Sequence, residues 1–299
     1  MAADRIADIQ KAHGIVGRAA ELSLLSACGR ARRHVLLEGP VGVGKTVLAK
    51  AVAASLGKPI VRVDGDGRYT EQKLTGWFDP PVVMKSGYTP DSFLPGPLVD
   101  AMRAGGVLFI NELNRMPEGV QNVLLPALDE GIIVVPKLGT VKAAPGFWVI
   151  ATQNPREFVA TSHLSEALLD RFELVRLDHP PEDSELEITR REVALQRNGE
   201  ASLPDLETFQ QRAVILVRAT RRDPRIRRGA SVRAAISIAL LAARQAADGV
   251  NPEDAFQHAV ALALPNRVEL ADDSNASLDE ILKELTEAAS AAAKKKTVS

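Results

Sequence analysis

Short apolar segments and helical patterns alternate along residues 14–178 of the chain. The segment Val107-Leu108-Phe109-Ile110 is apolar at every position, which is typical of a strand buried on both faces of a parallel sheet. Helices are predicted between the strands from apolar residues spaced by three and four positions. The predicted strands are 35–38, 60–64, 107–110, 147–151 and 174–177. This alternation predicts an α/β fold with a parallel sheet flanked by helices.

Three segments add detail to this pattern. Residues 66–100 are irregular and rich in glycine and proline, and within them 74–78 and 86–88 predict a projecting turn or short hairpin. Residues 131–143 predict a second hairpin, with strands over 132–135 and 140–143. Apolar residues spaced by four positions predict one helix over residues 117–130.

The strand pattern disappears from Pro180 onward. Helical patterns replace it over residues 182–198, 205–219, 231–247 and 252–263. We therefore predict three parts: an α/β domain over residues 1–179, a small all-helical lid domain over 180–276, and a C-terminal helix with a basic tail over 277–299.

Composition narrows the possible classes of protein. The formal net charge is −1 and 45% of the residues are apolar, so the whole chain has no strong attraction for nucleic acid or anionic membranes. The arginine cluster over residues 218–228 lacks interleaved aromatic residues, which favours a solvated or subunit-facing surface over a nucleic-acid site. Cys28 is the single cysteine, which excludes an intramolecular disulfide. With neither an apolar signal core nor a run of about 18 apolar residues, the chain is predicted to be cytoplasmic, without a membrane span.

A glycine-rich segment, Gly39-Pro40-Val41-Gly42-Val43-Gly44-Lys45-Thr46, follows the first predicted strand and precedes a helix. Its spacing, G-x-x-x-x-G-K-T, is that of a phosphate-binding loop. Glycines allow several backbone N–H groups to point at one anion, and the helix N-terminus adds a positive end. We expect Lys45 to reach the β- and γ-phosphates and Thr46 to bind Mg²⁺. The alternative is a turn that merely joins a strand to a helix.

Two polar residues, Asn111 and Glu112, end the buried strand that starts at Val107. Ligands lie at this edge of open α/β sheets, so Glu112 is the candidate general base that polarises a water for attack on the γ-phosphate. Its alternative role is to cap a helix or pair with an arginine. Most nucleotidases with a phosphate loop have Asp at the position of Asn111, and a neutral amide attracts a cation less strongly. We therefore expect weaker Mg²⁺ affinity or slower turnover, with nucleotide binding retained.

Three further residues are candidates for contact with a nucleotide. Asn154 follows the next buried strand and can orient the attacking water, although Asn-Pro is also a common start of a turn. Arg171 ends a predicted helix, where a cation is mildly favourable in any case. Arg233 lies in the first turn of a helix capped by Ser231, where a cation costs roughly 0.3–1 kcal/mol unless it faces an anion.

Taken together, these motifs resemble the AAA+ ATPases and, among them, the MoxR family, over about residues 14–270. The stretches that carry the resemblance are 39–46, GGVLFINELNRMP at 105–117, AAPGFWVIATQNP at 143–155, LSEALLDRFEL at 164–174 and GASVRA at 229–234. The resemblance implies that Asn154 is the sensor 1 residue, Arg171 a trans-acting arginine finger and Arg233 the sensor 2 residue. It implies sheet order 5-1-4-3-2 and ATP with Mg²⁺ as cofactors, with Thr46 and Asn111 on the metal. The implied nucleotide contacts are Val16, Gly39, Pro40, Val41, Gly42, Val43, Gly44, Lys45, Thr46 and Val47.

The resemblance also implies partners. An arginine finger acts on a neighbouring subunit, so the chain is expected to form a homo-oligomeric ring, commonly a hexamer. MoxR-like proteins resemble chaperones that act on a protein client together with a partner carrying a von Willebrand A domain. The segments 76–97 and 131–143 resemble the two inserts of the clade that includes magnesium chelatase and the MCM helicases. Two alternatives stay open: a nucleotide-gated scaffold with slow hydrolysis because of Asn111, and a DNA or RNA translocase, against which the near-neutral charge argues.

Overall fold

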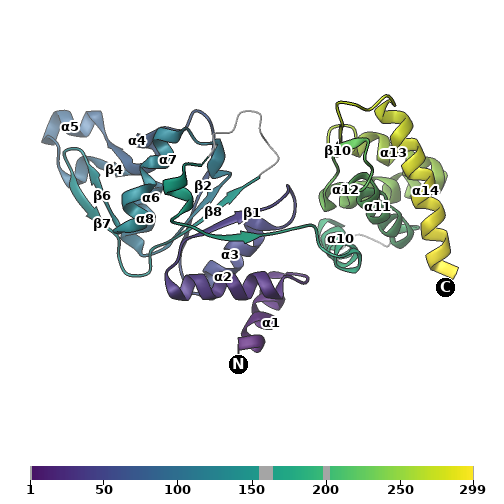
Figure 1. Ribbon diagram of the computed structural model, residues 1–299, viewed down its shortest axis with the longest axis horizontal. Coiled ribbons are helices and arrows are strands. Elements are labelled where there is room, and N and C mark those ends of the chain that lie inside the picture. Colours follow the sequence, from purple (N-terminus) through teal and green to yellow (C-terminus); the bar gives the residue numbers. More distant parts are fainter. Residues whose placement is uncertain (1, 155–163, 198–202, 299) are drawn as a thin grey trace. The chain divides into compact units, whose positions relative to one another are not determined.

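The computed structural model describes residues 2–154, 164–197 and 203–298. The chain forms two compact units, residues 1–178 and 179–299 (Figure 1). The first unit is an α/β domain and the second is built mainly of helices. Among the described residues, no helix is both long enough and apolar enough to cross a membrane.

A five-stranded parallel sheet forms the centre of the first unit. Its strands are β1 (Val35–Glu38), β2 (Ile60–Asp64), β5 (Val107–Asn111), β8 (Trp148–Gln153) and β9 (Glu173–Arg176). They lie in the order β2-β5-β8-β1-β9, and all neighbours are parallel. Numbered along the chain, this order is 5-1-4-3-2, which confirms the prediction.

The two faces of the sheet pack against different helices. Val107 and Phe109 of β5 belong to the core shared with α1 (Ala2–His13), α2 (Ala19–Ala31) and α3 (Lys45–Ser55). Leu108 and Ile110 belong to the opposite core, which contains α6, α7 and α8. The bounds of these helices are α6 (Pro97–Ala104), α7 (Glu118–Asn122) and α8 (Leu124–Asp129). Every side chain of β5 before Asn111 is therefore buried, which explains its uninterrupted apolar sequence.

The predicted single helix over residues 117–130 is wrong in one respect, because two short helices, α7 and α8, occupy this segment. Pro126 has no N–H group, so it cannot donate to the carbonyl of Asn122, where α7 ends. The interruption follows from that missing hydrogen bond.

The two inserts lie side by side at one edge of the α/β domain (Figure 1). The first contains α4 (Glu71–Thr75), α5 (Pro80–Ser86), a 3₁₀ turn at Pro90–Ser92, and the antiparallel strands β3 (Gly76–Phe78) and β4 (Phe93–Pro95). The second is the hairpin of β6 (Ile132–Val135) and β7 (Gly139–Lys142), as predicted apart from a one-residue shift. The Lys137 ammonium lies 5.9 Å from the Tyr88 ring and so joins the two inserts. A short helix, α9 (Glu166–Leu169), precedes β9.

The second unit contains five helices among the described residues. They are α10 (Glu182–Arg197), α11 (Leu206–Thr220), α12 (Val232–Ala247), α13 (Pro252–Ala263) and α14 (Leu278–Val298). The expectation that strands are absent after Pro180 is wrong, since β10 (Ile226–Arg228) pairs with β11 (Glu269–Leu270). This ribbon is too short for a periodic pattern, and an ion pair between Arg227 and Glu269 joins its strands.

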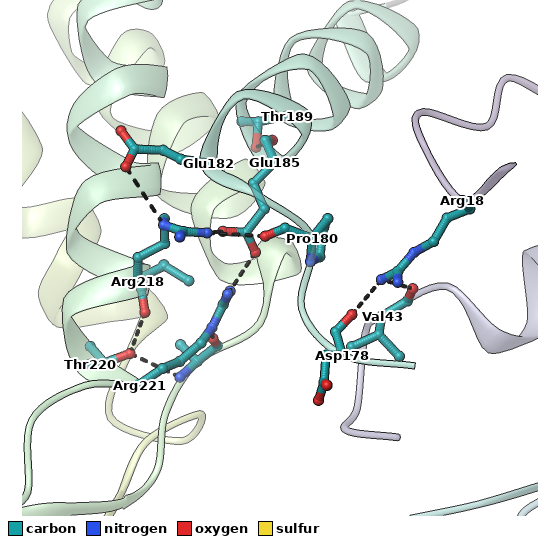
Figure 2. Close-up of polar contacts among 12 residues, drawn as sticks. Arg18, Val43, Asp178, Pro180, Glu182, Glu185, Thr189, Arg218, Thr220 and Arg221 are labelled. Carbon is teal, nitrogen blue, oxygen red and sulfur yellow. Dashed lines mark hydrogen bonds and ion pairs between the residues drawn. The ribbon is translucent and has the colours of Figure 1, made fainter. Parts of the chain in front are cut away.

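Two arginines of the basic cluster face inward rather than solvent (Figure 2). The buried carboxylate of Glu185 accepts from Arg218 Nη1 at 2.8 Å and Arg221 Nη1 at 2.6 Å. Arg218 also donates to the carbonyl oxygen of Pro180 at 3.1 Å. Burial lowers the pKa of Arg221, and the Glu185 charge opposes that shift. This part of the cluster neutralises an internal acid, since a buried carboxylate without a partner is costly.

Candidate active site

The phosphate loop curls between β1 and α3, and two kinds of constraint explain its glycines. A Cβ on Gly39 would lie 2.2 Å from the carbonyl oxygen of Leu177, so no larger residue fits there. Gly42 and Gly44 have φ values of 82° and 98°, in the left-handed region that favours glycine. The predicted loop conformation therefore depends on the glycines of the motif.

The ammonium group of Lys45 lies inside the curl of the loop. Its Nζ donates to the carbonyl oxygens of Gly39 at 2.5 Å and Pro40 at 2.9 Å. Gly44 is the N-cap of α3 and offers no side chain to cap it, and the first turn of α3 contains no acid. The N-terminus of α3 thus adds the positive end of a helix dipole beside the Lys45 cation. This donor set fits the phosphates of a nucleotide.

Polar residues end all five parallel strands on the side of the sheet where the loop lies. Glu38, the last residue of β1, accepts from Gln153 Nε2 on β8 at 2.6 Å and from Arg176 Nε on β9 at 3.2 Å. These bonds tie the strand that enters the phosphate loop to both of its neighbours. These bonds were not predicted from the sequence, although parallel strands always bring their carboxyl ends together.

Asn111, at the end of β5, lies between two polar partners. Its Nδ2 donates to Asp64 Oδ1 of β2 at 2.9 Å, and its Oδ1 accepts from Thr152 Oγ1 of β8 at 3.1 Å. The guanidinium of Arg62 hydrogen-bonds to Asp64 and, with Asn111, holds the pKa of that carboxyl below its usual range. A negative charge is therefore present beside Asn111, one strand away from the position where Asp is usual.

Glu112 has left-handed backbone angles, φ 57° and ψ 53°. Its N–H donates to Oγ1 of the fully buried Thr152 at 2.9 Å. Its carboxylate pairs with Arg115 Nη1 at 3.1 Å, as the alternative role predicted. Both side chains are partly exposed, so this pair contributes about 0–1 kcal/mol. The backbone conformation costs about 1–3 kcal/mol, and strain of this kind is concentrated at functional sites. We therefore favour the functional role for Glu112.

Gly65, directly after β2, packs against the turn that carries Glu112. Its N–H donates to the carbonyl oxygen of Asn111 at 2.7 Å. A Cβ at this position would lie 2.1 Å from the carbonyl oxygen of Glu112. Gly65, Asp64 and Thr152 were not among the residues predicted from the sequence. The predicted strand order places β2 beside β5, and that signal could have identified the first two.

The other predicted residues lie in different places. Asn154 is buried one residue beyond β8, on the same sheet edge as Asn111, whereas Pro155 lies outside the described residues. Arg171 follows α9 and pairs with Asp129 Oδ2 of its own chain at 2.5 Å. Arg233 is exposed in the first turn of α12, in the second unit. The α/β domain thus brings the phosphate loop, Asn111, Glu112 and Asn154 to one edge.

Val16 is half-buried in the segment between α1 and α2, close in sequence to Arg18. The Arg18 guanidinium joins that segment to the phosphate loop (Figure 2). Arg18 Nη2 donates to the carbonyl oxygen of Val43 at 3.3 Å and to that of Asp178 at 2.5 Å, while Nη1 pairs with Glu21 at 2.7 Å. The segment that contains Val16, an implied nucleotide contact, is therefore hydrogen-bonded to the phosphate loop through Arg18.

The donor set of the site also fits Mg²⁺. Mg²⁺ keeps several waters and takes few protein ligands, usually oxygens. Thr46 supplies a hydroxyl in the first turn of α3, Asn111 supplies an amide oxygen, and Asp64 and Glu112 supply carboxylates at the strand ends. When bound, the ion would neutralise charge that develops on the phosphates.

Fold and site together define a nucleotidase with a phosphate loop. Residues 34–172 match the family described as "AAA domain (dynein-related subfamily)". YeaC of Bacillus subtilis, an uncharacterized protein, is 31% identical over 86% of this chain and 88% of its own length. The gas vesicle ATPase GvpN of Haloferax mediterranei is 33% identical over 54% of this chain and 51% of its own length. A solved structure of an ATPase candidate from Cytophaga hutchinsonii has TM-score 0.51 and 23% identity, covering 96% of this chain and 94% of that one, and shows the fold.

The chain belongs to the MoxR family of AAA+ ATPases. It binds nucleotide and hydrolyses ATP. The chain spans about half the length of GvpN.

Proposed function

We propose that this ATPase works as a cytoplasmic homo-oligomeric ring, a hexamer, that uses ATP and Mg²⁺. Glu112 accepts a proton from the attacking water, and Asn154 orients that water. The neighbouring subunit's Arg171 and this chain's Arg233 contact the phosphates. The position of Arg171 supports this proposal, because it lies partly exposed at the end of a short helix. Its guanidinium pairs with Asp129 and donates to the carbonyl oxygen of Ala167, one turn earlier. An exchange of that carboxylate for a phosphate needs only a side-chain movement.

Mixing two inactive variants tests whether sites are shared between subunits. Glu112→Gln and Arg171→Ala are each expected to lack ATPase activity as pure rings. In rings formed from equal amounts of both, about one quarter of the sites combine an intact Glu112 with an intact neighbouring Arg171. We expect activity to recover toward that fraction. Mixed rings, verified by mass photometry, that stay inactive would contradict a trans-acting Arg171.

We further propose that the ring remodels a protein client, with a partner that carries a von Willebrand A domain. The observation that carries this proposal is the exposure of large apolar side chains on the two inserts. Met84 of α5 is 89% exposed and Val134 of the hairpin is 74% exposed. Trp77, Tyr88 and Leu94 on the first insert are also exposed. Apolar side chains gathered on projecting segments are typical of surfaces that bind another protein.

A trapped variant tests the client proposal. Glu112→Gln, loaded with ATP, is used to capture proteins, and each captured protein is then assayed for stimulation of the wild-type ATPase. We expect Met84→Ser/Val134→Ser to abolish capture when combined with Glu112→Gln. The same double substitution in the active protein should abolish stimulation. Leu262→Ser is the matched control, since Leu262 is 68% exposed but lies on α13 of the other unit. If the insert variant captures clients and responds to them as well as Leu262→Ser and the unsubstituted protein do, the inserts have no role in client binding.

The second candidate function is a nucleotide-gated assembly scaffold. The neutral Asn111 favours it, because fewer negative charges at the metal position slow hydrolysis. The two functions differ in steady-state turnover: a scaffold assembles with ATP but shows almost no phosphate release, even with a client present.

A further inference from the structure

Asp64, one of the oxygen donors that fit Mg²⁺, also contacts Asn111, the most unusual residue of the site. It ends β2, and the parallel register places it directly opposite Asn111. Its Oδ1 accepts from Asn111 Nδ2 at 2.9 Å, and Arg62 Nη2 donates to the same oxygen at 2.6 Å. The carboxylate is thus held from one side by a cation and binds the amide from the other.

This contact decides which way the Asn111 amide faces. A carboxylate only accepts hydrogen bonds, so the NH₂ group of Asn111 must face Asp64. The amide oxygen then faces Thr152 on β8. Because β8 lies between β5 and β1, that oxygen points toward the strand that carries the phosphate loop. In the opposite orientation an NH₂ group would face the loop, and it could not accept from a metal-bound water.

The hydrogen bonds continue in one direction to Glu112. Thr152 Oγ1 accepts from the Glu112 N–H at 2.9 Å, so its own proton goes to Asn111 Oδ1 at 3.1 Å. The chain of contacts therefore runs from Arg62 through Asp64, Asn111 and Thr152 to the left-handed backbone of Glu112. Each polar group in it has a partner of the correct type.

We infer that Asp64 is a positioning residue for ATP hydrolysis. It fixes the Asn111 oxygen toward the nucleotide and, through Thr152, supports the backbone of Glu112. The site therefore contains one carboxylate and one amide in contact, with the carboxylate on β2 and the amide on β5. This inference deepens the proposed role of Glu112 and rests on it. It also means that Asn111 and Asp64 act as a unit.

A double-mutant cycle tests the pairing. Asn111→Asp alone places two carboxylates within hydrogen-bond distance, and Asp64→Asn alone leaves two amides that can flip together. We expect each single variant to lose about tenfold in kcat, and Asn111→Asp to unfold about 2–4 °C lower than wild type. In Asp64→Asn/Asn111→Asp the amide introduced on β2 donates to the carboxylate introduced on β5, so the hydrogen bond is restored in the reverse direction. We therefore expect kcat and the unfolding temperature of the double variant to return to within about threefold and about 1 °C of wild type.

Binding measurements separate this inference from the proposed function. We expect the dissociation constant of a fluorescent ATP analogue in EDTA to stay unchanged in all variants. Its Mg²⁺-dependent tightening should weaken in Asp64→Asn, which removes the carboxylate, and recover in the double variant, which restores one carboxylate and one amide. Asp66→Asn is the matched control, since Asp66 is exposed and pairs with Arg68 outside the network. A double variant no better than the sum of the singles in unfolding temperature and Mg²⁺ dependence would overturn the inference. Those two measurements decide it even if the proposed role of Glu112 fails.

Discussion

Glu112→Gln is expected to reduce ATP hydrolysis by about 10²–10⁴-fold while leaving the affinity for ATP unchanged. Glutamine has the shape of glutamate but cannot take a proton from water. It still donates and accepts through the same backbone, so the Thr152 contact at 2.9 Å is retained. Phosphate release in steady state and equilibrium binding of a fluorescent ATP analogue measure the two effects.

Glu118→Gln is the control for this variant. Glu118 is an exposed acid at the start of α7, six positions from Glu112, and its substitution is expected to leave both quantities within experimental error. If Glu112→Gln retains a tenth or more of the wild-type rate, about 1.4 kcal/mol at most in the barrier, then another group activates the water.

Gly65→Ala is expected to slow hydrolysis by about 10²-fold, with a smaller effect on ATP binding. The added Cβ would meet the carbonyl oxygen of Glu112 at 2.1 Å and its carbonyl carbon at 2.9 Å. These are backbone atoms, so the turn that carries Glu112 must move by about 1 Å, and a displacement of this size costs about 10²-fold in rate. The phosphate loop is formed by other segments, so nucleotide binding should persist.

Gly67→Ala is a closely matched control, because a Cβ at Gly67 meets no atom within 4 Å. Both substitutions make the same chemical change two residues apart. Their ATPase rates, ATP affinities and thermal unfolding midpoints should therefore be compared side by side. Equal rates for the two variants would show that the position of the Glu112 turn does not limit hydrolysis.

Most of the α/β fold could be predicted because its signals are local. An uninterrupted apolar run identifies a strand covered on both faces, and the strand bounds of β1 and β2 agree with the prediction to the residue. Two features of the fold could not be predicted from the sequence. The break between α7 and α8 depends on the missing N–H of Pro126, which a periodic pattern does not register. The ribbon of β10 and β11 pairs two very short strands that lie far apart in sequence, so no local pattern indicates it.

The site likewise has one part that could be predicted from the sequence and one part that could not. The phosphate loop could be predicted because its glycines, lysine and threonine are consecutive. The polar network around Asn111 could not, because Asp64 and Thr152 reach it only through the register of neighbouring strands. Arg171 shows a different limit: its present partner, Asp129, lies 42 positions away, and its proposed partner lies on another molecule.

Arg18 connects the phosphate loop to the end of the α/β domain through its guanidinium group. Its guanidinium holds the carbonyl oxygens of Val43, inside the loop, and Asp178, the last residue of the domain. A displacement of Val43 therefore changes a hydrogen bond of the same guanidinium that holds Asp178. The phosphate loop and the point where the chain leaves the domain are in this way connected through one side chain, without passing through the sheet.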